Sequence, residues 1–275
     1  MQIKNGGVGK TTTTVNLGNG LFRKGKRVLL IDLDPQGDLT TSLGYKNPNS
    51  LDYIIKNLME KEIQEIPISK NEAILKSEEG VSFIPANIEL EALELSMIKY
   101  MNKENILKKY INKIKEDYDY ILIDCRPALG LLTINALSTA DSVIIPVQAQ
   151  YLPLKDMTQL LQTIDKIRVQ INPKLKVEGI LLTMVDMKTN LAKVSIESLK
   201  NNYGRRIKIY DMIIPMGVKA AESTIEGKSV YAYDKKSKPA IAYEELTKEV
   251  LKDSERNKVR LAENSRNNKN SWNIK

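Results

Sequence analysis

Gly6-Gly7-Val8-Gly9-Lys10-Thr11-Thr12 is the stretch that decides the fold, and it leads into a helical pattern over Thr11–Lys24. Glycine reaches positive φ angles without steric cost, so the backbone N–H groups of such a loop can turn toward one point. The helix that follows adds the positive end of its dipole, which favours a bound phosphate. Lys10 supplies a charge for β- and γ-phosphates, and the Thr11 hydroxyl suits Mg²⁺, which prefers oxygen ligands. We therefore predict a loop that binds nucleotide phosphates.

The loop departs from the ordinary phosphate-loop pattern. G-x-x-x-x-G-K-[ST] is met from Gly9 onward, but its first glycine would fall at Lys4. The loop is therefore a variant of that pattern.

Apolar runs and helical patterns alternate beyond the loop, and short apolar runs between polar segments are typical of buried parallel strands. The expected strands are Val28–Leu33, Val81–Pro85, Tyr120–Asp124, Ser142–Pro146, Val177–Val185 and Ile207–Ile214. Further helices are expected over Ile88–Lys99, Lys103–Glu116, Leu129–Ala140, Pro153–Ile171, Ala192–Tyr203 and Ile241–Lys252. The alternation predicts an α/β fold with a doubly wound, mostly parallel sheet flanked by helices.

Three aspartates stand at the ends of expected strands, where ligands gather in sheets of this kind. Asp32 and Asp34 belong to the first strand, and Asp124 ends another. Phosphoryl transfer requires positioning and charge neutralisation rather than a covalent nucleophile. A lysine, a metal ion, acidic groups and a helix N-terminus meet that requirement.

Composition excludes several other chemistries. The 275 residues include no histidine, which excludes a Ser-His-Asp triad, a Cys-His dyad and zinc sites built on imidazole. A lone cysteine, Cys125, excludes a disulfide framework within the chain and fits a reducing cytoplasm. No window reaches the roughly 18 apolar residues that span a bilayer.

The net charge of +8 is concentrated in the C-terminal third. Met1–Val185 carries 23 basic and 22 acidic residues, whereas Asp186–Lys238 carries 11 and 6 and Leu251–Lys275 carries 7 and 3. Composition leaves two interpretations open, a solvated surface with a frayed basic tail or a face that binds nucleic acid.

The loop resembles the deviant Walker A motif, K-G-G-x-G-K-[ST]-T, of the ParA/MinD branch of P-loop ATPases. From about residue 3 to residue 252, further motifs resemble those of the ParA (Soj-like) partitioning proteins. These motifs are Val28-Leu-Leu-Ile-Asp-Leu-Asp-Pro-Gln-Gly37, Ile84-Pro-Ala-Asn87, Tyr118-Asp-Tyr-Ile-Leu-Ile-Asp-Cys-Arg-Pro127, and Ile214-Pro215 leading into Glu226-Gly-Lys-Ser229.

The resemblance implies an ATPase that uses ATP and Mg²⁺. Catalysis is then assigned to Lys10, to Asp34, which positions the attacking water, and to Asp124, the Walker B aspartate, with Asp32 as a support for the metal site. Thr11, Asp34 and Asp124 are the implied metal residues. The implied nucleotide-binding residues are Gly6, Gly7, Val8, Gly9, Lys10, Thr11, Thr12 and Pro215.

The resemblance also implies partners. The ATP-bound form would be a homodimer that binds DNA without sequence preference through Lys188 and Lys219. A ParB-like centromere-binding protein would stimulate hydrolysis, and the protein would be cytoplasmic and associated with the nucleoid. A membrane partner is disfavoured.

Three positions depart from the family pattern. Asn5 stands where the family has a lysine that reaches the partner's phosphates, so we expect weakened turnover because asparagine brings no charge. Arg126 stands where proline is common, and it could approach a phosphate or a partner or be a surface residue. A full strand precedes the loop in the family, whereas only Met1-Gln2-Ile3 precede Lys4. We accordingly predict an ATPase domain over 1–252 with a shortened first strand, and a flexible basic tail over 253–275.

Other functions on the same fold stay open to different degrees. A DNA-binding adaptor with impaired hydrolysis is the non-enzymatic alternative, because of Asn5. A MinD-like positioning ATPase needs a C-terminal amphipathic membrane helix, and residues 255–275 offer only a weak apolar face. An iron–sulfur reductase needs more cysteines than Cys125, and a tyrosine kinase of this branch needs a tyrosine-rich tail, whereas the last tyrosine is Tyr243.

Overall fold

The computed structural model describes residues 7–126, 129–149 and 154–270, with only the backbone described for 154–156 and 257–270. Its strands are β1 (Val28–Leu33), β2 (Leu75–Lys76), β3 (Ser82–Ile84), β4 (Tyr120–Cys125), β5 (Ser142–Gln148) and β6 (Lys176–Thr183). Its α-helices are α1 (Lys10–Arg23), α2 (Asp38–Ser42), α3 (Ile55–Gln64), α4 (Glu89–Met97), α5 (Ile106–Ile114), α6 (Leu131–Thr139), α7 (Leu154–Gln170), α8 (Asn190–Tyr203), α9 (Val218–Glu226), α10 (Val230–Asp234) and α11 (Lys238–Asn270). Single 3₁₀ turns lie at Pro48–Ser50, Lys103–Asn105 and Lys115–Asp117.

The strands form two sheets. The larger has the order β2-β3-β1-β4, in which β1 is parallel to β3 and β4 and only the short edge strand β2 is antiparallel. The smaller consists of the parallel pair β5-β6. The predicted strand over Ile207–Ile214 is present only as an isolated parallel bridge from Ile180 to Ile209, with a second bridge from Val185 to Pro215. The mostly parallel α/β fold predicted from the sequence is confirmed.

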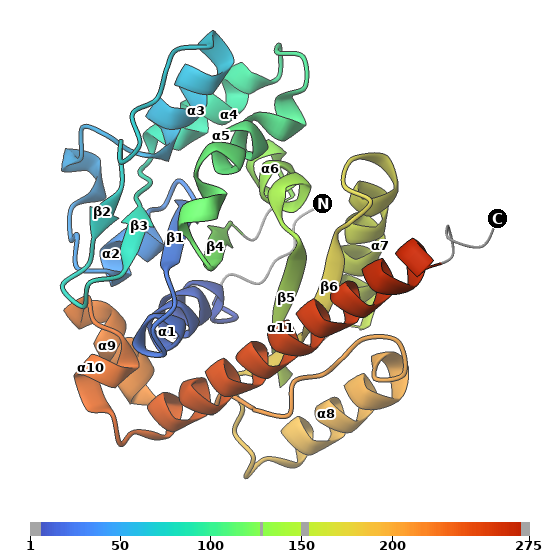
Figure 1. The fold of residues 1–275 in the computed structure, drawn as a ribbon. Coiled ribbons are helices and arrows are strands. Elements are labelled where there is room, and N and C mark those ends of the chain that lie inside the picture. Colours follow the sequence, from blue (N-terminus) through green and yellow to red (C-terminus); the bar gives the residue numbers. More distant parts are fainter. Residues whose placement is uncertain (1–6, 127–128, 150–153, 271–275) are drawn as a thin grey trace.

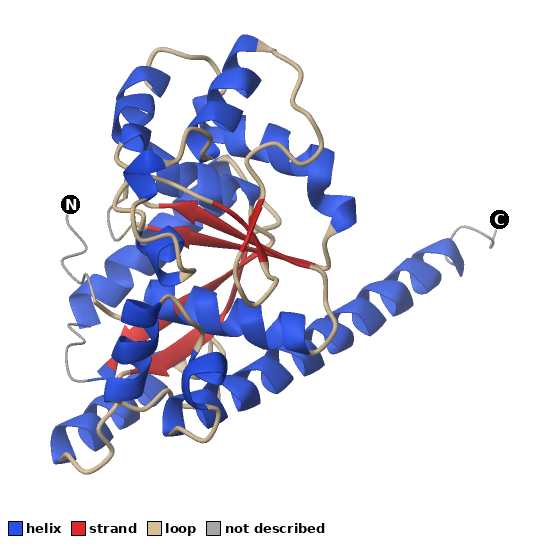
Figure 2. Ribbon diagram, turned by 90° about the vertical axis from the view of Figure 1, so that its left-hand side faces the viewer, coloured by secondary structure: helices blue, strands red, loops and turns tan. Residues whose placement is uncertain are grey.

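Helices cover both faces of the larger sheet (Figures 1 and 2). Alternate β1 residues serve the two faces: Leu30 packs with α1 and α11 side chains such as Leu21 and Leu246, whereas Ile31 packs with α3 to α6. Both faces of a central parallel strand are therefore apolar, which explains why every residue of β1 is buried.

A cavity of about 1060 Å³ separates the two sheets. Residues from both β4 and β5 line it, among them Leu122 and Ile144, and Val8 and Lys10 of the glycine loop also border it. The described residues contain no strand that pairs with β4 on the side away from β1. The glycine loop therefore borders the space between the two sheets.

The last helix is longer than the sequence analysis predicted. The pattern Ile241–Lys252 lies within α11, which continues to Asn270 and extends beyond the rest of the fold (Figure 2). Alanine, leucine, glutamate, lysine and arginine beyond residue 252 favour a helix, although they provide few apolar anchors for packing. The domain boundary at 252 and the flexibility of 253–275 stay predictions. None of the described helices has the length and apolar character that crossing a membrane requires.

Candidate nucleotide and metal site

The glycine loop has the backbone that its sequence predicts. Gly7 and Gly9 have φ angles of 91° and 78°, in the region that disfavours other residues. The first N–H groups of α1 have no partner within the helix, because Thr13 N–H is the one that reaches back to the Gly9 carbonyl. These groups and the positive end of the helix dipole are therefore available to an anion. Gly6 lies outside the described residues.

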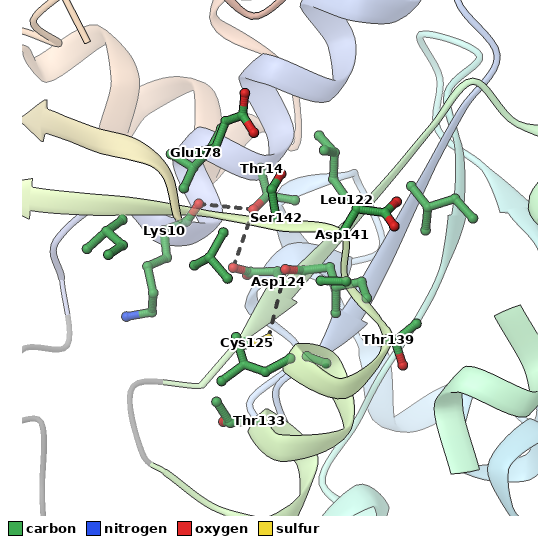
Figure 3. A pocket seen from close by; sticks show the side chains of 18 of the residues that line it. Lys10, Thr14, Leu122, Asp124, Cys125, Thr133, Thr139, Asp141, Ser142 and Glu178 are labelled. Carbon is green, nitrogen blue, oxygen red and sulfur yellow. Dashed lines mark hydrogen bonds between the residues drawn. The ribbon is translucent and has the colours of Figure 1, made fainter. Parts of the chain in front are cut away.

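Thr11 and Asp124 join the loop to the larger sheet. The Thr11 hydroxyl donates to Asp124 Oδ2 at 2.6 Å. The Thr14 hydroxyl lies 3.5 Å from Asp124 Oδ1, a contact that Figure 3 draws as a dashed line. Thr12 lies in the same first turn of α1, and its carbonyl accepts a bond from Asn16. The structure therefore places Thr11 next to Asp124, two of the three residues that the resemblance implies for the metal.

A magnesium ion would find oxygen ligands here. The hydroxyl of Thr11 and the carboxylates of Asp124 and Asp34 form a set of hard donors, which is the set that Mg²⁺ prefers. Within the described part of the chain, no three acidic, cysteine or histidine side chains form a complete metal cage. Mg²⁺ commonly keeps several waters and binds through one or two protein groups and a substrate phosphate, so the residues fit this ion.

Asp34 and Asp32 have different environments at the end of β1. Asp34 is partly exposed, and among the described residues its Oδ1 accepts one hydrogen bond, from the Gln36 N–H at 3.0 Å. Asp32 is fully buried, and its oxygens accept bonds from the Thr40 N–H, the Thr40 hydroxyl and the Asp34 N–H. Asp32 therefore holds the backbone that carries Asp34, whereas the Asp34 carboxylate retains acceptor capacity for a water molecule.

Burial changes the proton affinities of the site. It raises the pKa of Asp124 to about 6 and that of Asp32 to about 7, in the second case with help from the neighbouring charge of Asp124. Burial also raises the pKa of Asp34 and lowers that of Lys10, although the charges of Asp124 and Asp34 oppose the effect on Lys10. A bound cation would favour the ionised carboxylates, so metal binding and deprotonation are coupled here.

Thr183, at the end of β6, is a site residue that the sequence analysis missed. Its hydroxyl donates to the Val8 carbonyl at 2.8 Å, and its side chain lies 3.8 Å from the position that a Cβ would take at Gly9. The glycine loop is thus bonded to both sheets, through Thr183 to the smaller and through Thr11 to the larger. A threonine at the end of an apolar run carries no signal that would distinguish this role.

Pro215, Lys188 and Lys219 lie beyond the same end of β6. Pro215 bridges Val185, two residues past Thr183. Both lysines are exposed. Lys188 follows Val185 by three residues and Lys219 follows Pro215 by four, so both lie near the same end of the smaller sheet. Lys188 is free of ion pairs in the described structure, whereas Lys219 pairs with Glu222 at 3.0 Å. The DNA-binding assignment of both lysines, like the assignments within the loop, stays a prediction.

Comparison with known proteins decides the family. The AAA domain family matches residues 1–177. Sporulation initiation inhibitor protein Soj of Bacillus subtilis (strain 168) is 42% identical over 86% of this chain and 90% of its own length. This chain belongs to the Soj/ParA family of P-loop ATPases. Another Soj/ParA relative is the chromosome partitioning protein ParA of Myxococcus xanthus (strain DK1622), 39% identical over 85% of this chain and 80% of its own length.

Solved structures extend the Soj/ParA comparison to the fold. Cobyrinic acid a,c-diamide synthase from Mycobacterium smegmatis with bound ADP and magnesium has a TM-score of 0.78 at 33% identity, over 91% of this chain and 92% of that chain. The septum site-determining protein MinD from Pyrococcus horikoshii OT3, in complex with Mg-ADP, has a TM-score of 0.69 over 90% and 92% of the two chains. At 24% identity, the second likeness concerns the fold alone. The resemblance to the ParA/MinD branch seen in the sequence is confirmed.

Proposed function

We propose that this chain is a ParA-type partitioning ATPase that hydrolyses ATP with Mg²⁺. The observation that carries the proposal is the Thr11–Asp124 hydrogen bond, which brings the phosphate loop onto the acidic end of β4. Lys10 would neutralise the β- and γ-phosphates, and Thr11 and Asp124 would hold the metal, which supplies further charge neutralisation. Asp34 would orient the attacking water from the end of β1. Bound ADP and magnesium in the Mycobacterium smegmatis relative support ATP and Mg²⁺ as cofactors.

The cellular part of the proposal follows the relatives named for chromosome partitioning. ATP would favour a homodimer that binds DNA without sequence preference, and a ParB-like protein would stimulate hydrolysis and release. Lys188 and Lys219, which are exposed beyond the site, would supply the positive charge that contacts to DNA phosphates need. We propose a cytoplasmic, nucleoid-associated protein on this basis.

Reversing the charge of Lys188 and Lys219 together tests the DNA face. We expect Lys188→Glu with Lys219→Glu to weaken ATP-dependent binding to duplex DNA at least tenfold at 150 mM salt, because two phosphate contacts become repulsive. The slope of log affinity against log salt should also fall by about 2. Fluorescence anisotropy with duplexes of two unrelated sequences measures both quantities.

Lys174→Glu with Lys176→Glu is the matched control for this experiment. These lysines are exposed at the opposite, amino end of β6, and their replacement changes the net charge equally. DNA binding that falls equally in the two double variants would assign the effect to overall charge and would contradict the proposed face.

Asn5 provides a second test, because its uncharged side chain is the reason to expect slow turnover. We expect Asn5→Lys to raise the rate of ATP hydrolysis in the presence of DNA and the partner protein by about tenfold, as a charge-assisted contact to phosphate would give. A steady-state phosphate-release assay measures the rate, and Asn5→Gln is the uncharged control. Equal rates for the wild type and Asn5→Lys would show that position 5 does not limit turnover.

A further inference from the structure

Arg126 leaves β4 beside the point where Asp34 leaves β1. The parallel register pairs Asp32 with Asp124 and Leu33 with Cys125, so the next residues on the two strands are Asp34 and Arg126. Adjacent strands lie about 4.8 Å apart. Arg126 is thus the first residue beyond the acidic end of β4, at the level of the residue that would orient the attacking water.

The guanidinium of Arg126 is held by Glu94. Arg126 Nη1 lies 3.0 Å from Glu94 Oε2, and the other carboxylate oxygen accepts the N–H of Leu132, in the first turn of α6, at 3.1 Å. A Cβ at Gly130 would lie 2.2 Å from Glu94 Oε1, so this carboxylate position depends on glycine at 130. The Glu94 carboxylate is therefore held in place by the start of α6, and its bond from the Leu132 N–H does not involve Arg126.

This pairing draws Arg126 away from the direction that strand geometry favours. Side chains two residues apart in a strand point to the same face, so a continued strand would direct Arg126 to the face of Asp124, over which the phosphate loop lies. Glu94 instead belongs to α4, which packs with Leu93 on the opposite face, against Ile31. The side chain of Arg126 is 30% exposed and that of Glu94 17%, so the pair is accessible to water.

The charge of Arg126 already acts on the site. The charges of Arg126 and Lys10 both lower the pKa of Asp34, and they oppose the larger rise that burial causes. Arg126 also borders the same cavity as Lys10 and Asp124. Arg126, Lys10 and Asp124 therefore border one common space without any rearrangement of the strands.

We propose that Arg126 binds the terminal phosphate of ATP, and that Glu94 holds its guanidinium while that phosphate is absent. This inference rests on the proposed ATPase function. A terminal phosphate offers more negative charge and more acceptor oxygens than one carboxylate, and arginine can bind two of those oxygens at once. The Glu94 carboxylate keeps its bond from the Leu132 N–H and some contact with water when Arg126 leaves, which limits the cost of its release. Arg126 would accordingly distinguish ATP from ADP.

Nucleotide affinities with Mg²⁺ test this assignment. The probes are ADP and the non-hydrolysable β,γ-imido analogue of ATP, titrated by calorimetry into the wild type, Arg126→Ala, Arg126→Lys and Glu94→Gln. We expect Arg126→Ala to bind the ATP analogue about 10- to 100-fold more weakly, with the ADP affinity changed less than about twofold. Arg126→Lys should recover part of the loss. Glu94→Gln keeps an acceptor for Leu132 and frees the guanidinium, so it should bind the ATP analogue more tightly and ADP unchanged.

The opposite signs of the two single variants make the test decisive. If the Arg126–Glu94 pair only ties the loop to α4, both variants weaken both nucleotides alike, and the inference is overturned. An unchanged affinity of Arg126→Ala for the ATP analogue also overturns it. If Arg126→Ala fails to fold, the Glu94→Gln variant decides alone. Tighter binding of the ATP analogue than in the wild type would support the inference, and equal or weaker binding would overturn it. A wild-type chain that binds neither nucleotide would instead contradict the proposed ATPase function.

Discussion

Replacing Asp34 with alanine is expected to lower kcat for ATP hydrolysis by about 10²- to 10⁴-fold and to leave ATP affinity nearly unchanged. The carboxylate accepts one bond from its own turn, at Gln36, and is close enough to Lys10 and Asp124 for their charges to interact. Its removal therefore eliminates the group that orients the attacking water, whereas the phosphate contacts of the loop and Lys10 persist. Single-turnover phosphate release gives the rate, and a nucleotide titration gives the affinity.

Asp34→Asn separates charge from structure in this experiment. The amide oxygen can still accept the Gln36 N–H, so the turn is preserved. We expect this variant to be slow as well, since the amide cannot attract a proton from water as the carboxylate does. Turnover by Asp34→Ala within about threefold of the wild type would remove Asp34 from the mechanism.

Replacing Asp124 with asparagine is expected to stabilise the nucleotide-free protein at pH 8 and to abolish its stabilisation by Mg²⁺ and ATP. Burial raises the folded pKa of Asp124 to about 6 from its ordinary value of 3.8. The folded chain then binds the proton more tightly than the unfolded chain, so ionisation of Asp124 lowers the free energy of unfolding as the pH rises from about 4 to about 6, after which the penalty is constant. The shift corresponds to at most about 3 kcal/mol.

Chemical denaturation in EDTA at pH 5 to 8 measures this penalty. Asp32, with a folded pKa of about 7, contributes in the same direction up to that pH, whereas Asp119 and Glu72, with pKa values lowered to about 2, act in the opposite direction and below about pH 4. The difference between the wild type and Asp124→Asn isolates Asp124 from these groups. The interpretation would be wrong if the variant were less stable than the wild type at pH 8.

The sequence predicted those parts of the molecule that local patterns encode. The glycine loop, the buried strands that begin at Val28 and Tyr120, and the aspartates at their ends follow from composition and spacing. The hydrogen bond from Thr11 to Asp124 is a finding of the structure that the sequence analysis did not state. Each depends on a short segment or on the rule that parallel strands end at one edge.

The remaining parts depend on contacts between distant segments. The bonds from Thr183 to Val8 and from Glu94 to Arg126 join residues far apart in the chain. Helices α2 and α10, of five residues each, were not predicted, because such short helices are fixed by packing more than by their own pattern. Helices α3 and α9 were not predicted either. The sequence also did not predict that β4 and β5 belong to two different sheets, because strand pairing joins segments that are distant in the chain.

The glycine loop is hydrogen-bonded to both sheets and so connects the half of the molecule built on the larger sheet with the half built on the smaller sheet. Its bond to Thr183 belongs to the half that carries Lys188 and Lys219, and its bond to Asp124 belongs to the half that carries Asp34. A ligand that orders the loop therefore favours one spacing of the halves over others. If nucleotide binding changes the affinity for a partner that prefers one spacing, then that partner changes the affinity for nucleotide by the same factor, because the coupling between two binding sites is reciprocal. The end of β6 that carries the two lysines and the end of β4 that carries Asp124 are thus joined through a few hydrogen bonds at one turn of backbone.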